Sequence, residues 1–115
     1  MHEGQPLTQR LAAFVAETPA IPLTTVEPAK SVILDTIGVA LAATSRPIGR
    51  IISRHAAMTG TPASATVLGC GIRTSPEMAA LANGTLANAL DFDDGSHLST
   101  HILPAALAVA EPCQG

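Results

Sequence analysis

The chain has 115 residues, of which nine are acidic and six are lysine or arginine, so it forms one domain at most and carries a formal net charge of −3. The cations are scattered and the apolar runs are short, which predicts no nucleic-acid partner, no membrane-spanning segment and no secretory signal. Hydrophobic residues make up 47% of the chain but aromatic residues only 2%, so we expect closely packed helices that further protein covers.

The first two elements are predicted to be helices. Apolar residues recur at helical spacing over 7–18 and predict the first of them. The segment 24–44 predicts a long second helix, with Thr24 or Thr25 as its N-cap and Pro28 tolerated in its first turn. Because the body of this helix is apolar on nearly all sides, we expect it to be buried.

Two residues interrupt the apolar body of the second helix. Asp35 needs a partner if it is buried, and Gly38 is expected to permit a close helix crossing.

A third helix is predicted over 45–58, and 65–69 is the one convincing strand-like run, since it is extended in character and bounded by glycine.

Two further helices complete the predicted elements. Ser75 is a strong N-cap for a helix over 76–90, with proline and an acid in its first turn. The last helix is predicted over 99–111, with Pro104 in or just after its first turn. The sequence therefore predicts a mainly α fold of about five helices with one short strand-like segment.

Three acids and two histidines gather between the last two helices, in the segment 91–101, DFDDGSHLSTH. Asn83 and Asp91 are eight residues apart, so both are predicted to project from one face of the preceding helix. A carboxylate at the negative end of a helix is unfavourable, which indicates a functional reason for Asp91.

The remaining residues of the segment allow two interpretations. Asp93 and Asp94 are interpreted as turn residues, with Ser99 capping the next helix. His97 and His101 share a face if that helix starts early, and an imidazole near a carboxylate can act as a general acid or base near neutral pH. The alternative, that both histidines are surface polar residues beside a loop, stays open.

The spacing of the cluster does not match known metal sites. Its acids stand at relative positions 1, 3 and 4 with glycine at 5, whereas a calcium loop of the EF-hand type needs oxygen ligands at 1, 3 and 5 and glycine at 6. A zinc site of Asp91, His97 and His101 is chemically conceivable but lacks any diagnostic spacing. We therefore expect no metal and no cofactor.

The other reactive side chains give weak signals. His55 is interpreted as the polar edge of its helix, and Cys70 as a structural residue between two glycines. Cys70 and Cys113 lack motif spacing, which favours free thiols and a cytoplasmic protein.

Beyond single motifs, the run ATVLGCGIRTSPEMAALANGTLANALDFDDGSHLSTHILPAALAVAE resembles the N-terminal part of the MmgE/PrpD family, the 2-methylcitrate dehydratase group. The upstream run AKSVILDTIGVALAAT resembles the second helix of that family. The succession of Asn-Gly, Leu-Asp-Phe-Asp-Asp, His and Pro-Ala-x-x-Ala-x-x-Glu is specific, and the resemblance extends from about Leu7 to Glu111.

The resemblance implies a fold and an activity. Family members include 2-methylcitrate dehydratase, cis-aconitate decarboxylase and iminodisuccinate epimerase, which transfer a proton at a carbon beside a carboxylate of a small polycarboxylate. They combine a large helical domain with a smaller α/β lid, often as homodimers, without an obligatory metal. Dehydration of 2-methylcitrate, a step of propionate metabolism, is the expected reaction, with decarboxylation or epimerisation as alternatives.

The resemblance also implies site residues. The first Asp of the family's DFDD run corresponds to Asp91, and a histidine of the following segment corresponds to His97 or His101. Counting forward from Asp91 favours His101, whereas counting back from Pro104 favours His97, which we prefer. Leu98, Asn88 and Gly95 replace the proline, histidine and threonine common in the family, which leaves the substrate open.

By the same resemblance, residues 1–115 correspond to part of the helical domain, without its remainder or the lid. We expect the chain alone to show little activity, since its scattered cations cannot hold a polycarboxylate. A non-catalytic helical module that associates with other chains is the alternative, because the uncovered apolar faces of such a piece favour association.

Overall fold

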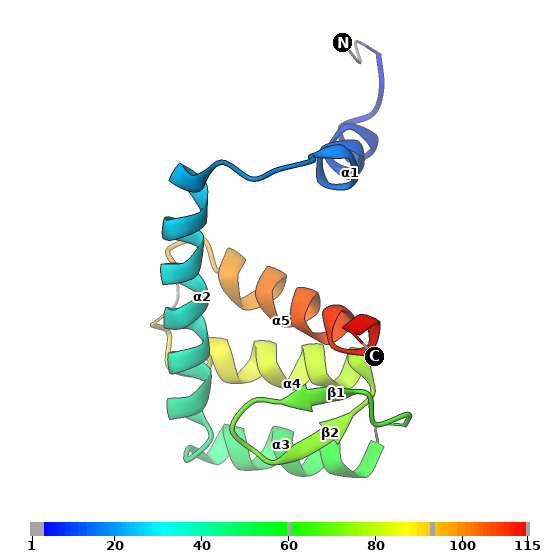
Figure 1. Ribbon diagram of the computed structural model, residues 1–115. Helices are drawn as coiled ribbons and strands as arrows, with labels where there is room; N and C mark the ends of the chain where they lie inside the picture. The colour runs from blue at the N-terminus through cyan, green and yellow to red at the C-terminus, as the bar shows by residue number, and fades with distance from the viewer. Residues whose placement is uncertain (1–3, 60, 93, 115) are drawn as a thin grey trace.

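The computed structural model describes residues 4–59, 61–92 and 94–114, and over these ranges the chain is mainly helical, as the sequence predicts. Asp93, a predicted turn residue, lies outside the described residues. Five α-helices, two short strands and a 3-10 turn follow one another along the chain (Figure 1). Their bounds are α1 Leu7–Glu17, α2 Leu23–Ala43, α3 Pro47–Thr59, β1 Ala65–Val67, β2 Ile72–Thr74, α4 Pro76–Asn88, α5 Leu98–Ala110 and η1 Pro112–Gln114.

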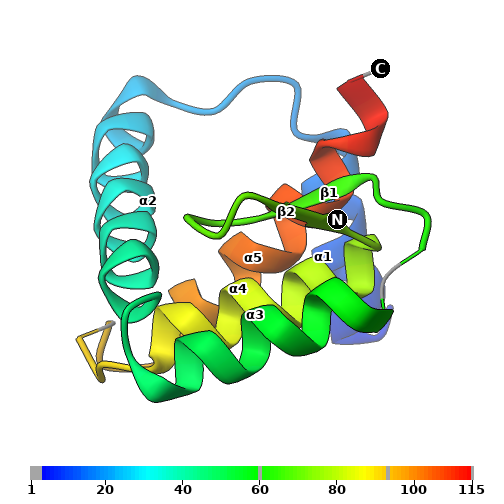
Figure 2. The ribbon, with the colours of Figure 1, turned by 90° about the horizontal axis from the view of Figure 1, so that it is seen from below.

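Helix α4 lies at the centre of the fold. Both views place it between α3 and α5, and α2 stands across one end of these three helices (Figure 1, Figure 2). The β1–β2 hairpin packs against α3, α4 and α5. Leu86 is the largest fully buried side chain in a core made mainly of alanine: Ala40, Ala43, Ala56, Val67, Ala82, Leu86 and Ala87. The small side chains allow the helices to approach one another closely.

The two strands form an antiparallel hairpin, in which Ala65 pairs with Thr74. The first strand was predicted from the sequence and the second was not, because β2 has only three residues and no alternating pattern. Gly69 and Gly71 have positive φ angles of 68° and 64°, a backbone conformation that glycine adopts without strain. These glycines allow the chain to reverse and so bring β2 beside β1.

Helix α1 has the predicted bounds but stands apart from the other helices (Figure 1). None of its residues is buried, and four large apolar side chains on it are more than half exposed: Leu7, Leu11, Phe14 and Val15. The helical spacing therefore predicts the element correctly, and the described residues place no packing partner on its apolar face.

Helix α2 begins earlier than predicted. Its N-cap residue is Pro22, without a side-chain hydrogen bond, so the prediction of Thr24 or Thr25 as the cap is wrong. The fixed φ of proline already suits the entry into a helix. As a consequence Pro28 lies inside the helix rather than in its first turn.

The prediction that the body of α2 is buried is also wrong for most of its length. Thr36, Val39, Ala40 and Ala43 are the buried residues of this helix. The large apolar side chains on its other faces are exposed: Val32 by 47%, Ile33 by 40% and Leu34 by 74%. Among the described residues, this helix packs mainly against α4 and α5.

The two interrupting residues of α2 are exposed. Asp35 is not buried, so it needs no buried partner. Beyond the backbone of its own helix, no atom lies within 4 Å of a Cβ built on Gly38, so the prediction of a close helix crossing at this residue is wrong. The close approach occurs instead at Gly49 in the first turn of α3, where a Cβ would overlap the carbonyl oxygen of Ala43 and lie 2.9 Å from that of Thr44.

Helix α4 starts as predicted and ends earlier. The Ser75 hydroxyl accepts a hydrogen bond from the Met78 N–H at 3.4 Å, so Ser75 is the N-cap. The helix ends at Asn88, with Ala89 as its C-cap.

Helix α5 begins at Leu98, so Pro104 lies in its second turn. The loop that joins α4 and α5 carries the acid–histidine segment.

No single helix within residues 4–59, 61–92 and 94–114 is both long and apolar enough to cross a membrane, and α2 and α3 meet these criteria only together, as a pair bent by 93°.

Candidate active site

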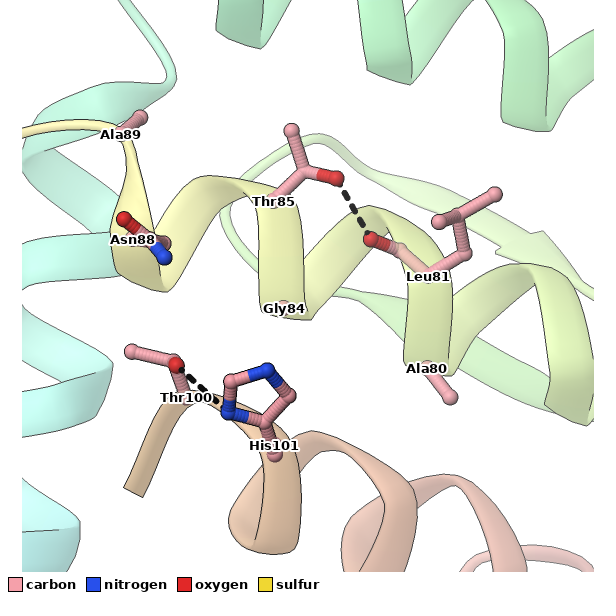
Figure 3. A pocket seen from close by; sticks show the side chains of 8 residues that line it. All are labelled: Ala80, Leu81, Gly84, Thr85, Asn88, Ala89, Thr100 and His101. Carbon is pink, nitrogen blue, oxygen red and sulfur yellow. Dashed lines mark hydrogen bonds between the residues drawn. The ribbon is translucent and has the colours of Figure 1, made fainter. Parts of the chain in front are cut away.

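A groove of about 560 Å³ lies between α4 and α5, near the first turn of α5 (Figure 3). Helix α4 and its C-cap supply one wall, and α5 supplies the other. The His101 ring lies in the space between the two helices (Figure 3). The lining residues are Ala80, Leu81, Gly84, Thr85, Asn88, Ala89, Thr100 and His101. This lining is mainly small or apolar with a few polar groups, as is usual for sites that bind small molecules.

The narrowness of the groove depends on a glycine. A Cβ built on Gly84 would lie 3.1 Å from the carbonyl oxygen of Thr100, which is tighter than an ordinary van der Waals contact. Glycine therefore lets the first turn of α5 approach α4 and brings the neighbouring His101 to the groove.

The contacts of His101 determine which ring nitrogen carries the proton. Its Nδ1 lies within hydrogen-bonding distance of the His97 carbonyl oxygen and 3.3 Å from the Thr100 hydroxyl. The hydroxyl donates to the same carbonyl at 2.8 Å. A carbonyl oxygen can only accept, so Nδ1 is the donor, and in the neutral ring Nε2 carries the lone pair. His101 is exposed as a residue, and its Nε2 is thus suited to accept a proton.

His97 occupies the N-cap position of α5 and is absent from the lining of the groove. Its backbone is left-handed, with φ 56° and ψ 19°, which few residues other than glycine adopt. The side chain is exposed. In this structure the carbonyl oxygen of His97, which accepts from Thr100 and His101, contributes to the groove's geometry.

Asp91 lies on the turn that follows α4, where its side chain is exposed. Its φ of 55° is also left-handed, and its N–H donates to the Asn88 carbonyl at 3.0 Å. Within the part of the chain that the structure describes, no hydrogen bond or ion pair joins its carboxylate to His101. Asp91 is absent from the lining of the groove and follows the lining residue Ala89 by two positions in the chain.

The prediction that Asn83 and Asp91 project from one helix face is wrong, because α4 ends before Asp91. Asn83 is buried and holds the hairpin onto α4. Its Oδ1 accepts from the Leu68 N–H at 2.8 Å, and its Nδ2 donates to the Thr66 carbonyl at 2.9 Å. Asn83 is thus a structural residue.

The predicted cap of α5 is also corrected. The cap is the carboxylate of Asp94, which accepts from the N–H groups of Ser96 at 3.0 Å, Leu98 at 3.1 Å and Ser99 at 2.7 Å. Hydrogen bonding by Ser99, through its side chain and its N–H, lowers the pKa of Asp94 far below its ordinary value. Ser99 is a donor in the first turn rather than the cap, because α5 begins at Leu98 and its N-cap position falls at His97, two residues before Ser99.

Two adjoining hollows lie on the α2 side of the same loop. Asp35, Phe92 and Asp94 line the smaller one, together with residues of α2 and Ser99. The other lies along α2 and is lined by Leu90 and Phe92 from the loop. Among the described residues, no lysine or arginine lines the groove or either hollow. These surfaces therefore lack a fixed positive charge.

The described residues contain no group of three or more His, Cys, Asp or Glu side chains placed to hold a metal ion.

Cys70 and Cys113 are free thiols, as the sequence predicts. Cys70 is half-buried, and its Sγ lies 2.9 Å from the Ser53 hydroxyl. His55 is exposed on α3, away from the groove lining.

The structure thus separates the three predicted site residues. His101 lines the groove, His97 occupies the N-cap position of α5 without a side-chain cap bond, and Asp91 lies on the exposed turn that follows α4. The preference for His97 over His101 remains a prediction. The lining residues Thr85 and Gly84 were not singled out from the sequence, because only the packing of α5 on α4 makes them part of a groove.

The fold and the groove define a small, mainly helical domain that presents a histidine between two packed helices. The chain belongs to the MmgE/PrpD family, since the MmgE/PrpD N-terminal domain matches residues 9–115. It is 35% identical to human cis-aconitate decarboxylase (Homo sapiens) over 91 residues, which cover 75% of this chain and 19% of that protein. It is 32% identical to the mouse cis-aconitate decarboxylase (Mus musculus) over 87 residues, or 71% of this chain and 18% of that protein.

The chain therefore spans about a fifth of the length of these relatives. No solved structure matches the chain significantly.

Proposed function

We propose that this chain forms one wall of the active site of a lyase that transfers a proton at a carbon beside a carboxylate of a small polycarboxylate. Cis-aconitate is the first candidate substrate, because both relatives above carry the name cis-aconitate decarboxylase. The observation that supports the site is His101, whose Nδ1 is held by the His97 carbonyl while Nε2 is left for proton transfer.

The proposed chemistry uses His101 as the general acid or base. In decarboxylation, the bond from carbon to one carboxylate breaks, CO2 leaves, and a proton from the imidazolium is added at carbon. In dehydration of 2-methylcitrate, the second candidate, imidazole removes the proton beside a carboxylate and the electron pair of the C–H bond forms a C=C bond. The neighbouring C–O bond breaks, and the departing hydroxide takes the proton back from the imidazolium and leaves as water. The same histidine serves either reaction, so His101 by itself does not decide between decarboxylation and dehydration.

Both reactions need positive charge near the substrate carboxylates. No lysine or arginine among the described residues lines the groove, so we propose that protein covering the groove supplies these cations. A homodimer or a second domain would meet this need. For Asp91, which is exposed on the turn that follows α4, we propose a role in orienting the substrate or relaying a proton.

The test is an assay of the complete product of the reading frame that contains this sequence. We expect it to consume cis-aconitate or 2-methylcitrate, with the product identified by NMR spectroscopy. The 115-residue chain alone should turn over neither substrate at an enzyme-like rate, since it lacks the cations. Failure of the complete product with both substrates, together with self-association of the chain, would instead favour a non-catalytic helical module.

Replacing Gly84 with alanine tests whether the groove binds the substrate. The added methyl group meets the Thr100 carbonyl and pushes the first turn of α5 away, while the gain in helix propensity of about 1 kcal/mol offsets part of the strain. We expect kcat/KM of the complete product to fall about tenfold, because small displacements of a catalytic group are costly. Gly38→Ala, where nothing lies within 4 Å, is the matched control. Equal kcat/KM values for both variants would contradict a catalytic groove.

A further inference from the structure

Asp94 makes an unusually complete set of hydrogen bonds at the start of α5. One carboxylate oxygen accepts from the N–H groups of Ser96 at 3.0 Å and Leu98 at 3.1 Å, and the other accepts from the Ser99 N–H at 2.7 Å. The carbonyl oxygen of Asp94 accepts from the His97 N–H at 2.8 Å. The residue thus binds four consecutive N–H groups.

These four bonds enclose His97. The N–H groups before and after it are held by one oxygen of Asp94, and its own N–H is held by the Asp94 carbonyl. His97 has a left-handed backbone, which is costly for a residue with a side chain. Because the surrounding bonds fix this conformation, they also fix the direction in which the His97 carbonyl points.

The His97 carbonyl in turn holds the groove histidine. It accepts from the Thr100 hydroxyl at 2.8 Å and from His101 Nδ1. Its direction therefore decides whether the neutral ring of His101 carries its proton on Nδ1 and leaves Nε2 free. Asp94 itself lines the hollow on the α2 side and is absent from the lining of the groove, so the hydrogen-bonded path from Asp94 to His101 runs through the backbone of His97.

We propose that Asp94 is a positioning residue that sets the tautomer and orientation of His101 through the His97 carbonyl. The proposal rests on the function proposed above for its kinetic consequence, but its structural part does not. Asp94 remains ionised at neutral pH, because its hydrogen bonds hold its pKa well below the ordinary range. A full negative charge suits both the three N–H donors and the N-terminal end of α5.

The first measurement is ¹⁵N NMR spectroscopy of the histidine rings in the complete gene product at a pH where His101 is neutral. The nitrogen shifts distinguish a proton on Nδ1 from one on Nε2. We expect the Nδ1–H form of His101 in the wild type and a mixture of both forms in Asp94→Ala. Asp94→Asn should be intermediate, since its carbonyl can still accept from Ser96 and Leu98 whereas its amide cannot accept from Ser99. An unchanged tautomer in both variants would overturn the proposal.

The second measurement is steady-state kinetics. In Asp94→Ala we expect kcat to fall at least about tenfold, as a wrong tautomer disables a catalytic histidine, with KM within about twofold of the wild type. Asp94→Asn should recover part of the loss. Asp35→Asn, which changes an exposed carboxylate in the same hollow, is the matched control and should leave kcat unchanged.

The two measurements separate the possible failures. If the complete product is inactive, the proposed function is contradicted. The NMR measurement of the His101 tautomer then still tests the positioning role of Asp94. If Asp94 serves only to stabilise the fold, the variants lose thermal stability but keep the wild-type tautomer and kcat, which contradicts the proposal. If Asp94→Ala does not fold, Asp94→Asn decides the outcome alone.

Discussion

Replacing His101 with alanine in the complete gene product is expected to lower kcat by about two to four orders of magnitude, the usual contribution of a general acid or base. The reason is that His101 lines the α4–α5 groove and is the residue proposed above to transfer the proton. The measurement is steady-state kinetics with cis-aconitate and with 2-methylcitrate, and circular dichroism should show an unchanged fold, because the side chain is exposed.

The kcat values of other single-residue variants provide the comparison for His101→Ala. His55→Ala, which removes an exposed histidine outside the groove lining, should leave kcat unchanged. His97→Ala should cost less than His101→Ala, because the substitution keeps the His97 carbonyl that accepts from the His101 ring. Asp91→Asn should lower kcat if its carboxylate orients the substrate or relays a proton. A larger loss in His97→Ala than in His101→Ala would reverse the assignment of the two histidines.

Replacing Gly49 with alanine is expected to destabilise the folded protein by about 3 kcal/mol, at the upper end of the usual cost of overpacking. The added Cβ would overlap the Ala43 carbonyl oxygen and lie 2.9 Å from that of Thr44, so the backbone between α2 and α3 would have to move. Thermal or chemical unfolding of the complete product measures the change.

Gly38→Ala provides the matched control for this prediction. Both glycines are helical, but the position of Gly38 is open, so alanine there should stabilise α2 by about 0.5 to 1 kcal/mol through its higher helix propensity. Opposite signs for the two substitutions are required. A neutral Gly49→Ala would contradict the tight turn between α2 and α3.

The helices were predictable from the sequence because their signals are local. Helical spacing of apolar residues sets the bounds of α1, and the Ser75–Pro76 pair starts α4 where the hydroxyl accepts the Met78 N–H. The start of α2 at Leu23 was missed, since Pro22 precedes it without a side-chain cap. Strand β2 was missed because it is defined by pairing with β1 rather than by its own pattern.

Packing could not be predicted from the same signals. The apolar body of α2 predicts burial, yet most of its large side chains are exposed, because burial depends on what else lies against the helix. The close approaches occur at Gly49 and Gly84 rather than at Gly38, and no periodic pattern distinguishes these glycines. Tertiary contacts decide such positions.

The candidate site was predictable in part. The segment 91–101, in which acids and histidines gather, contains His101, which lines the groove. The left-handed turns at Asp91 and His97 separate residues that are close in sequence, which spacing arguments on a regular helix could not anticipate. For the same reason Asp94, interpreted as a turn residue, was not recognised as the cap of α5.

The most direct test of the account is a crystal structure of the complete gene product with a bound small tricarboxylate that cannot react. We expect the ligand to lie in the groove between α4 and α5, with Nε2 of His101 within hydrogen-bonding distance of it and with cations contributed by residues outside the groove lining. A ligand bound away from this groove, with His101 making no contact to it, would contradict the proposed site.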